Sequence, residues 1–237
     1  MTAVIIGASS GIGEALAHEL HRAGWRLGLM ARRRERLERL RDRLAPETLV
    51  RTIDVGQPGA AAILEGVIAE LGGVDLIVLS AGTGHNGSLN LEHDAETLAV
   101  NVTGFMAMAQ VAMRHFLAQR RGHLVGISSV AALRGNPAAS YAASKAFQSV
   151  YLDGLRAVAR QSGHPIAVTE VQPGGVDTAM LKPDRPLPPL VRRLFVASPT
   201  KAARQIVQAI ERRKKHAYIT GRYALVALVL KLLPRPG

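Results

Sequence analysis

The sequence contains no cysteine. A disulfide framework, a thiolate metal site and a cysteine nucleophile are therefore excluded, and any chemistry must come from oxygen and nitrogen groups. This absence agrees with a reducing cytosol without requiring one. Phe, Trp and Tyr make up only 4% of the chain, too few to suggest the base-stacking surfaces of proteins that bind single-stranded nucleic acid.

Long hydrophobic runs are also missing. No run reaches the roughly 18 to 20 apolar residues that are needed to span a bilayer. The first residues, MTAVIIGASSGIGEAL, lack the charged start and the uninterrupted apolar core of a signal peptide. We therefore expect a cytoplasmic protein.

Acidic residues are scarce relative to basic ones. The 18 Asp and Glu residues face 30 Lys and Arg residues, which gives a net charge of +12. This charge favours an anionic partner, such as nucleic acid, a membrane surface or a phosphorylated small molecule. Much of the excess lies at 31–44 and 211–216. In the first stretch Leu37, Leu40 and Leu44 fall at helical spacing, so we interpret most of its arginines as a solvated helix face rather than a nucleic-acid site.

Short apolar runs alternate with longer helical patterns along the 237 residues, a length that fits one large domain. The expected strands are 3–7, 26–30, 49–53, 74–80, 122–128, 165–173 and 216–220, and the expected helices are 13–23, 33–44, 58–71, 95–120, 140–161 and 200–213. This alternation predicts an α/β fold with a single-domain doubly wound, Rossmann-like parallel sheet and helices on both faces. We assign this domain to 1–222 and an apolar C-terminal segment to 223–237.

The turn GASSGIG follows the first expected strand directly. In a doubly wound sheet, ligands bind at the carboxyl ends of the strands near the switch in strand order. The glycine spacing lets the chain turn tightly, approach a pyrophosphate and pack the next helix on the sheet. The turn therefore predicts a dinucleotide site with the candidate ligands Gly7, Ser9, Ser10, Gly11, Ile12 and Gly13.

Arginines follow the second expected strand, in MARRR. A carboxylate at this place usually binds the ribose hydroxyl of NAD, whereas arginine accepts the 2′-phosphate of NADP. We therefore predict NADP(H) in preference to NAD(H), with Arg32 and Arg33 as the clamp; the alternative is that both only begin a solvated helix. After the third strand, Asp54 and Val55 are candidates to bracket the adenine, although a helix N-cap explains Asp54 equally well.

Tyr141 and Lys145, in SYAASKAF, stand at i and i+4 and would share one helix face. A phenol with its ordinary pKa of about 10 is a poor acid or base near neutrality. A lysine ammonium and the positive ring of an oxidised nicotinamide both favour the phenolate and so lower that pKa. The pair alone is weak evidence, because such spacings also arise on plain helix surfaces.

The motifs taken together resemble the short-chain dehydrogenase/reductase family, and the resemblance covers the chain to about residue 220. They are GASSGIG, SAG at 80–82, NVTG at 101–104, ISS at 127–129, YAASK at 141–145 and PGGVDT at 173–178.

The resemblance implies an NAD(P)-dependent oxidoreductase in which Tyr141 is the general acid/base. Lys145 would hold the nicotinamide ribose and lower the pKa of the tyrosine. A serine after the fifth strand would donate a hydrogen bond to the substrate oxygen, and Asn101 would hold a water that links Lys145 to bulk solvent. The implied catalytic set is Asn101, Ser129, Tyr141 and Lys145, and the further cofactor contacts are Ala81, Gly82, Asn101, Tyr141, Lys145, Pro173, Gly174, Val176 and Thr178.

Three positions depart from the family pattern. Ile6 replaces a common threonine before the first glycine, and Ser80 replaces an asparagine after the fourth strand. The usual spacing of thirteen residues before the tyrosine falls on Ser128, whereas alignment by the strand falls on Ser129. We prefer Ser129, because a strand end fixes the direction of a side chain while a loop tolerates deletion.

Some remaining polar residues have weaker assignments. His18 and His21 share a helix face, but no third ligand accompanies them, so we predict no metal site. His85 and Asn86 either border the substrate cleft or are ordinary polar loop residues. The proline-rich stretch 182–194 is expected to form a loop, with 183–190 as a lid.

The apolar segment 223–237 has three possible places: over the cleft, in a subunit interface, or on an anionic membrane as a peripheral contact. By resemblance, the helices at 95–120 and 140–161 would assemble a homodimer or a homotetramer.

We therefore predict an NADP-dependent oxidoreductase that interconverts a small-molecule carbonyl and a secondary alcohol by hydride transfer, without a nucleic-acid partner. The apolar tail and the lid hint at a lipophilic or acyl substrate. The alternative is a nucleotide-binding regulatory module without turnover. The complete set of Tyr141, Lys145 and Asn101 argues against it, because a sensor needs no proton relay.

Overall fold

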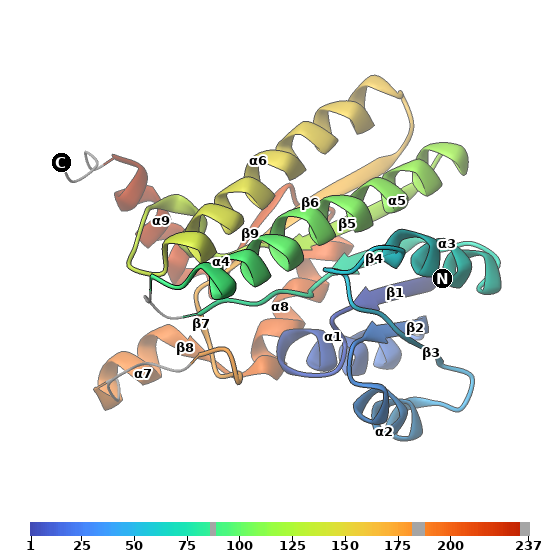
Figure 1. Ribbon diagram of the computed structural model, residues 1–237, viewed down its shortest axis with the longest axis horizontal. Helices are drawn as coiled ribbons and strands as arrows, with labels where there is room; N and C mark the ends of the chain where they lie inside the picture. The colour runs from blue at the N-terminus through green and yellow to red at the C-terminus, as the bar shows by residue number, and fades with distance from the viewer. Residues whose placement is uncertain (86–88, 182–187, 233–237) are drawn as a thin grey trace.

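A parallel sheet with strand order β3-β2-β1-β4-β5-β6-β9 organises the molecule (Figure 1). The computed structural model describes residues 1–85, 89–181 and 188–232, and within them every pairing in this sheet is parallel. The strands are β1 (Thr2–Ile6), β2 (Arg26–Ala31), β3 (Leu49–Thr52), β4 (Leu76–Leu79), β5 (Gly122–Ile127), β6 (Ile166–Pro173) and β9 (His216–Ile219). This arrangement confirms the predicted doubly wound fold.

Helices cover both faces of the sheet, as Figure 1 shows, and this explains why the strands are apolar on both sides. Alternate residues of β1 divide between two cores: Val4 and Ile6 face one, Ala3 and Ile5 the other. The first core packs under α3 (Ala60–Glu70), α5 (Phe105–Ala118) and α6 (Ala139–Gln161). The second packs under α1 (Gly11–Arg22), α2 (Arg34–Leu44) and α8 (Pro199–Glu211).

The helix predicted at 95–120 begins earlier and is interrupted. It starts as α4 (Leu91–Leu98), where the side chain of Asn90 accepts a hydrogen bond from the backbone nitrogen of His93 at 3.1 Å. It then passes through a π-helical turn, η1 (Ala99–Gly104), into α5. Such turns often mark functional positions, and the sequence periodicity gave no sign of this one.

The C-terminal part contains elements that were not predicted. A short pair, β7 (Gly175–Val176) with β8 (Val196–Ala197), precedes α8, and α9 (Arg222–Leu232) follows β9. The proline-rich stretch 182–194 lies partly outside the described residues. From Pro189 it is a helix, α7 (Pro189–Phe195), where a loop was expected, because proline is well tolerated in the first turn of a helix. In the described part of the chain, none of the helices is both long and apolar enough to cross a bilayer.

Candidate active site

The glycine turn after β1 lies at the switch in strand order, against the end of β4. Gly7 has a φ of +95°, and a Cβ there would lie 2.5 Å from the backbone nitrogen of Ala81. A Cβ on Gly13 would lie 2.2 Å from the carbonyl oxygen of Gly7. Glycine is therefore required at both places for α1 to start this close to the sheet.

Polar groups gather at the start of α1. Ser10 is its N-cap residue, but its side chain caps no backbone N–H. Its hydroxyl instead accepts a hydrogen bond from Arg33 Nη2 at 2.7 Å, and the same guanidinium reaches Ser9 Oγ at 2.9 Å. Gly11 faces Thr178, whose Cγ2 lies 3.0 Å from the position of an added Cβ. A helix N-terminus, two hydroxyls and a guanidinium form a donor set that fits a phosphorylated dinucleotide.

The two predicted clamp arginines point to different partners. Arg33 lies over the glycine turn, as its bonds to Ser9 and Ser10 show. Arg32 faces α4, where its Nη1 is 3.8 Å from Glu96 Oε1. Glu96 Oε2 also lies 3.0 Å from His85 Nε2, so Arg32 and His85 share Glu96 as a partner. Asn86, the predicted companion of His85, is outside the described residues.

The loop after β3 holds Asp54 and Val55. Asp54 Oδ1 accepts a hydrogen bond from the backbone nitrogen of Gly56 at 3.1 Å. The N-cap of α3 is Gly59, so the N-cap interpretation of Asp54 was wrong. Val55 is buried, and a Cβ on Gly104 would lie 2.4 Å from its carbonyl oxygen. Because Gly104 has no Cβ, η1 can pack closely against this loop.

Asn101 lies in η1 and is fully buried. Its Oδ1 accepts a hydrogen bond from the backbone nitrogen of Thr83 at 2.9 Å, and its Nδ2 donates to Thr83 O at 2.7 Å and to Ser144 Oγ at 3.0 Å. The side chain thus ties the loop after β4 to α6. Its backbone carbonyl accepts from Gln148 Nε2 at 2.8 Å.

Lys145 is buried in α6, and burial lowers the pKa of its amine to about 8. Its Nζ donates to Ile127 O at 3.0 Å and to Gln148 Oε1 at 2.9 Å. The Gln148 amide therefore bridges Lys145 and the carbonyl of Asn101. This contact joins Lys145 to Asn101 within the protein, and the water that would link Lys145 to bulk solvent stays a prediction.

Tyr141 meets Ser129 at the end of β5. Burial raises the pKa of the Tyr141 phenol, and the hydrogen bond with Ser129 lowers it by less, so the net direction is upward. The predicted lowering is thus not produced by the protein's own groups, although Lys145 Nζ lies 5.7 Å from the phenol ring centroid. Ser128 points elsewhere and donates to Glu170 Oε1 at 2.6 Å. Of the two candidate serines, Ser129 is the one that reaches the tyrosine.

The segment after β6 packs against the C-terminal helix. Pro173 and Val176 are buried, and the ring of Tyr223 occupies the place of a Cβ on Gly174. Tyr223 Oη accepts from the backbone nitrogen of Gly175 at 3.0 Å and donates to Phe195 O at 2.8 Å. One face of Gly174 is therefore covered by the protein itself.

Sequence reasoning missed several residues of this site. Gln148, Tyr223 and Gly84 carry no motif, yet a Cβ on Gly84 would lie 2.5 Å from Tyr141 Cδ2. Gly82, by contrast, was predicted from the SAG motif, and its added Cβ would lie 3.3 Å from Asn101 Oδ1. Gln148 offered one signal, because a polar residue three positions after Lys145 shares its helix face.

Comparison with known proteins gives a consistent result. A family model described as short chain dehydrogenase matches residues 1–187. A Myxococcus xanthus protein named an uncharacterized oxidoreductase is 34% identical over 99% of this chain and 93% of its own length. The Bos taurus dehydrogenase/reductase SDR family member 7B is 31% identical over 99% of this chain and 77% of its own.

Solved structures share the fold. A short-chain dehydrogenase/reductase from Burkholderia phymatum in complex with NAD superposes with a TM-score of 0.85 at 23% identity, over 100% of this chain and 96% of that one. An alcohol dehydrogenase from Thermococcus sibiricus complexed with 5-hydroxy-NADP gives 0.79 at 25% identity, over 92% and 94%. The sequence matches and the fold lead to one assignment: the chain belongs to the short-chain dehydrogenase/reductase family of NAD(P)-dependent oxidoreductases.

Proposed function

We propose that this chain is an NADP-dependent oxidoreductase that interconverts a carbonyl and a secondary alcohol, with Tyr141 as the general acid/base. The observation that carries this proposal is the convergence of two groups on Tyr141: Ser129, which lowers the pKa of its phenol, and the buried Lys145 amine, whose Nζ lies 5.7 Å from the phenol ring centroid. An acid/base group, a hydrogen-bond donor and a cation thus converge on one point, where a substrate oxygen would change its charge.

The residues of the chain divide the work around that oxygen. When bound, the nicotinamide supplies or accepts the hydride, and its oxidised form adds a positive charge that favours the phenolate. Tyr141 donates its proton to the oxygen during reduction and accepts the proton of the alcohol during oxidation. Ser129 donates a hydrogen bond to the same oxygen. Lys145, protonated below its pKa of about 8, favours the phenolate and holds the ribose.

The preference for NADP rests on the arginines beside the glycine turn. Arg33 already bridges Ser9 and Ser10, and Arg32 extends from the same loop toward α4. Arginine binds phosphate oxygens through two parallel hydrogen bonds, which suits a 2′-phosphate. The related structure from Sphingobium yanoikuyae is described in complex with NADPH, and the one from Burkholderia phymatum in complex with NAD, so arginine placement is the discriminating argument.

The position of the C-terminal helix indicates where the substrate would bind. α9 packs beside η2 (Val130–Leu133), directly after Ser129, and Tyr223 covers Gly174. We assign α9 as one wall of the substrate cleft. Leu225 and Leu228 are exposed on this helix. Exposed leucines could contact a second subunit or a membrane surface, so both contacts stay predictions. Residues 233–237 lie outside the described part of the chain.

Fluorescence titration with NADPH and NADH tests the cofactor preference. We expect Arg33→Ala and Arg32→Ala to weaken NADPH binding by roughly 10- to 100-fold, because each variant would lose hydrogen bonds to a charged phosphate. NADH has no 2′-phosphate, so its affinity should be nearly unchanged. Arg34→Ala is the matched control, because Arg34 is exposed and pairs with Glu38 at 2.8 Å. Equal losses for both nucleotides would overturn the clamp.

A carbonyl and alcohol panel tests the reaction, with Tyr141→Phe as the blank. Removal of an acid/base group should lower kcat by about 10²- to 10⁴-fold while the nucleotide still binds. If the unaltered protein binds nucleotide but turns over no member of a broad panel, a regulatory module is favoured. If Tyr141→Phe keeps full activity, the assigned acid/base is wrong.

A further inference from the structure

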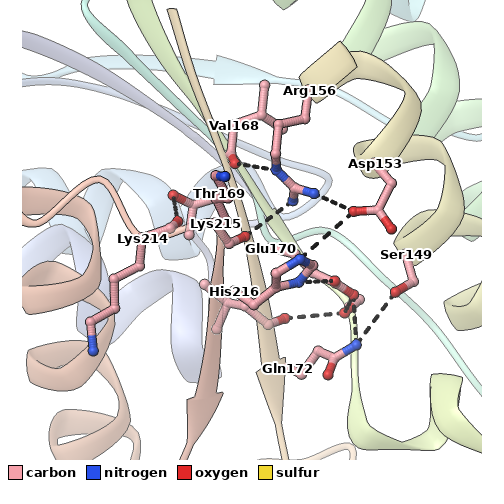
Figure 2. Close-up of polar contacts among 12 residues, drawn as sticks. Ser149, Asp153, Arg156, Val168, Thr169, Glu170, Gln172, Lys214, Lys215 and His216 are labelled. Carbon is pink, nitrogen blue, oxygen red and sulfur yellow. Dashed lines mark hydrogen bonds and ion pairs between the residues drawn. The ribbon is translucent and has the colours of Figure 1, made fainter. Parts of the chain in front are cut away.

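A buried carboxylate, Glu170, lies behind the candidate serine in the middle of β6. Its side chain is only 1% exposed. Figure 2 shows His216 from β9 and Gln172 from β6 pointing at it. His216 Nδ1 lies 3.0 Å from Glu170 Oε2, and Gln172 Nε2 donates to Glu170 Oε1 at 2.8 Å.

The Glu170 carboxylate remains ionised at neutral pH. Burial alone would raise its pKa, but hydrogen bonds from His216, Ser128, Ser149 and Gln172 outweigh burial and lower the pKa to about 2. An ionised carboxylate only accepts hydrogen bonds, so each neighbouring donor is held toward it. Charge-assisted bonds of this kind are roughly twice as strong as neutral ones.

One of these bonds reaches the end of β5. Ser128 Oγ donates to Glu170 Oε1 at 2.6 Å and also lies 3.2 Å from Val171 O. Successive side chains of an extended strand point to opposite sides. Ser129 is extended, with a φ of −169°, so when Ser128 is fixed toward Glu170, Ser129 points the other way, toward η2 and Tyr141. Its Oγ accepts a hydrogen bond from the backbone nitrogen of Ala131 in η2 at 3.1 Å.

Another bond reaches α6, the helix that carries Tyr141 and Lys145. Gln172 Nε2, held by Glu170, lies 3.4 Å from Ser149 Oγ, one helical turn after Lys145. At the rim, His216 Nε2 is 3.8 Å from Asp153 Oδ1, and Asp153 pairs with Arg156 of the same helix (Figure 2). Glu170 is thus joined both to the strand end that bears the serine and to the helix that bears the tyrosine.

We propose that Glu170 is a positioning residue: through Ser128 on one side and Gln172 and Ser149 on the other, it fixes Ser129 against Tyr141. The catalytic consequence rests on the proposed function, but the positioning itself is a property of the chain. The ionisable groups that face Glu170 from the packed elements are His216 directly, and Asp153 and Arg156 behind it.

The neighbouring residue provides a matched control. Thr169 is equally buried in β6 and faces the opposite side, where its Oγ1 lies 2.8 Å from His123 Nε2 and donates to Lys214 O at 2.5 Å. It links the same strands without touching Ser128. Thr169→Val therefore loosens this part of the sheet and leaves the serine anchor intact.

The first test needs no substrate. Tyr141 is titrated by NMR of the protein labelled with ¹³C at the phenolic carbon of tyrosine, in the unaltered chain, Glu170→Gln, Ser128→Ala, Ser128→Thr and Thr169→Val. Because the Ser129 hydrogen bond lowers the pKa of Tyr141, its loss should raise that pKa in Glu170→Gln and Ser128→Ala. Ser128→Thr keeps the hydroxyl and should restore the original titration, and Thr169→Val should not change it. An unchanged titration in the first two variants, or an equal rise in Thr169→Val, overturns the proposal.

The second test is kinetic and separates this inference from the function on which it rests. With a substrate from the carbonyl panel, Glu170→Gln and Ser128→Ala should lower kcat by about 10- to 100-fold, the cost of a misplaced catalytic group, with KM nearly unchanged. Thr169→Val should lower thermal stability and leave kcat unaltered. If Tyr141→Phe is fully active, the proposed function fails, and the tyrosine titration still decides whether Glu170 positions Ser129. A fall in stability without any change in kcat or in the titration would make Glu170 purely structural.

Discussion

Two buried ionisable groups lie on either side of the end of β5, and their surroundings affect them in opposite ways. Lys145 faces the tyrosine side, and burial lowers its pKa from 10.5 to about 8, toward the neutral form. Glu170 faces the far side, and its hydrogen-bond donors lower its pKa from 4.5 to about 2, toward the charged form. One group is destabilised as a charge, and the other is stabilised as a charge.

The partners explain this difference. The hydrogen-bond acceptors of Lys145 are the Ile127 carbonyl and the Gln148 amide, both neutral. Glu170 is met by several donors, including the imidazole of His216. A group with a perturbed pKa and little compensation is typical of an active site, whereas a satisfied charge is typical of a scaffold. By this criterion Lys145, whose buried charge is poorly compensated, is the better candidate for an active-site group.

The largest expected effect comes from Lys145→Met. We expect activity to fall by about 10²- to 10⁴-fold, because the phenolate loses its cation. Stability at pH 7 should rise by about 1 to 2 kcal/mol, because the cost of the buried charge disappears while two acceptors lose their donor. Below pH 8 Lys145 is charged in the folded protein, so the variant keeps its full advantage in stability. Between pH 8 and 10.5 the folded chain has released this proton and the unfolded chain has not, so the advantage fades.

Urea unfolding at pH 7 and pH 10 measures this gain. Lys201→Met is the control, since Lys201 is exposed in the first turn of α8. Should Lys145→Met be less stable than the unaltered protein at pH 7, the contrast between the two buried groups would collapse.

Glu170→Gln should have the next largest effect, and it should lower the stability of the protein where Lys145→Met raises it. The carboxylate contributes stability in full above pH 4.5, and this contribution is lost as the pH falls toward about 2. The difference in the free energy of unfolding between the unaltered protein and the variant should therefore be on the order of 3 kcal/mol at pH 7 and shrink toward pH 2, since one pKa unit corresponds to about 1.4 kcal/mol. Chemical unfolding across this pH range measures it. Glu65→Gln, at an exposed pair with Arg114, should show almost no such change, and a pH-independent loss in Glu170→Gln would contradict the assigned cause.

The sequence was sufficient for the fold because both cores follow from local patterns. Strands such as Leu76–Leu79 are buried throughout, and the apolar run predicts that directly. The π-helical turn at Ala99–Gly104 was not predictable, because one additional residue in a helical turn leaves the hydrophobic spacing almost unchanged.

The site was predictable where a motif fixes the backbone, and not where it depends on packing at a distance. Gly7, Asn101, Tyr141 and Lys145 come from motifs, and the structure brings the last three together around α6. The bridging role of Gln148 was missed, because it depends on the facing carbonyl of Asn101, 47 positions away in the chain. The anchoring of Ser128 by Glu170 was missed for the same reason, since those residues are 42 positions apart.

Gln148 allows the smallest and most specific test of the contrast. Gln148→Leu removes an acceptor of the Lys145 ammonium, so the pKa of Lys145 should fall further, whereas Gln148→Glu places a carboxylate there and should raise it. The shift is measured by NMR of lysine labelled at the ε-carbon, and kcat should fall by roughly 3- to 10-fold in Gln148→Leu, the usual worth of one neutral hydrogen bond. Gln205→Leu, on α8 and remote from Lys145, controls for the loss of an amide. If both Gln148 variants move the pKa of Lys145 in the same direction, repacking rather than electrostatics controls that lysine. Opposite shifts would show that the protein sets the charge of Lys145 through a single amide.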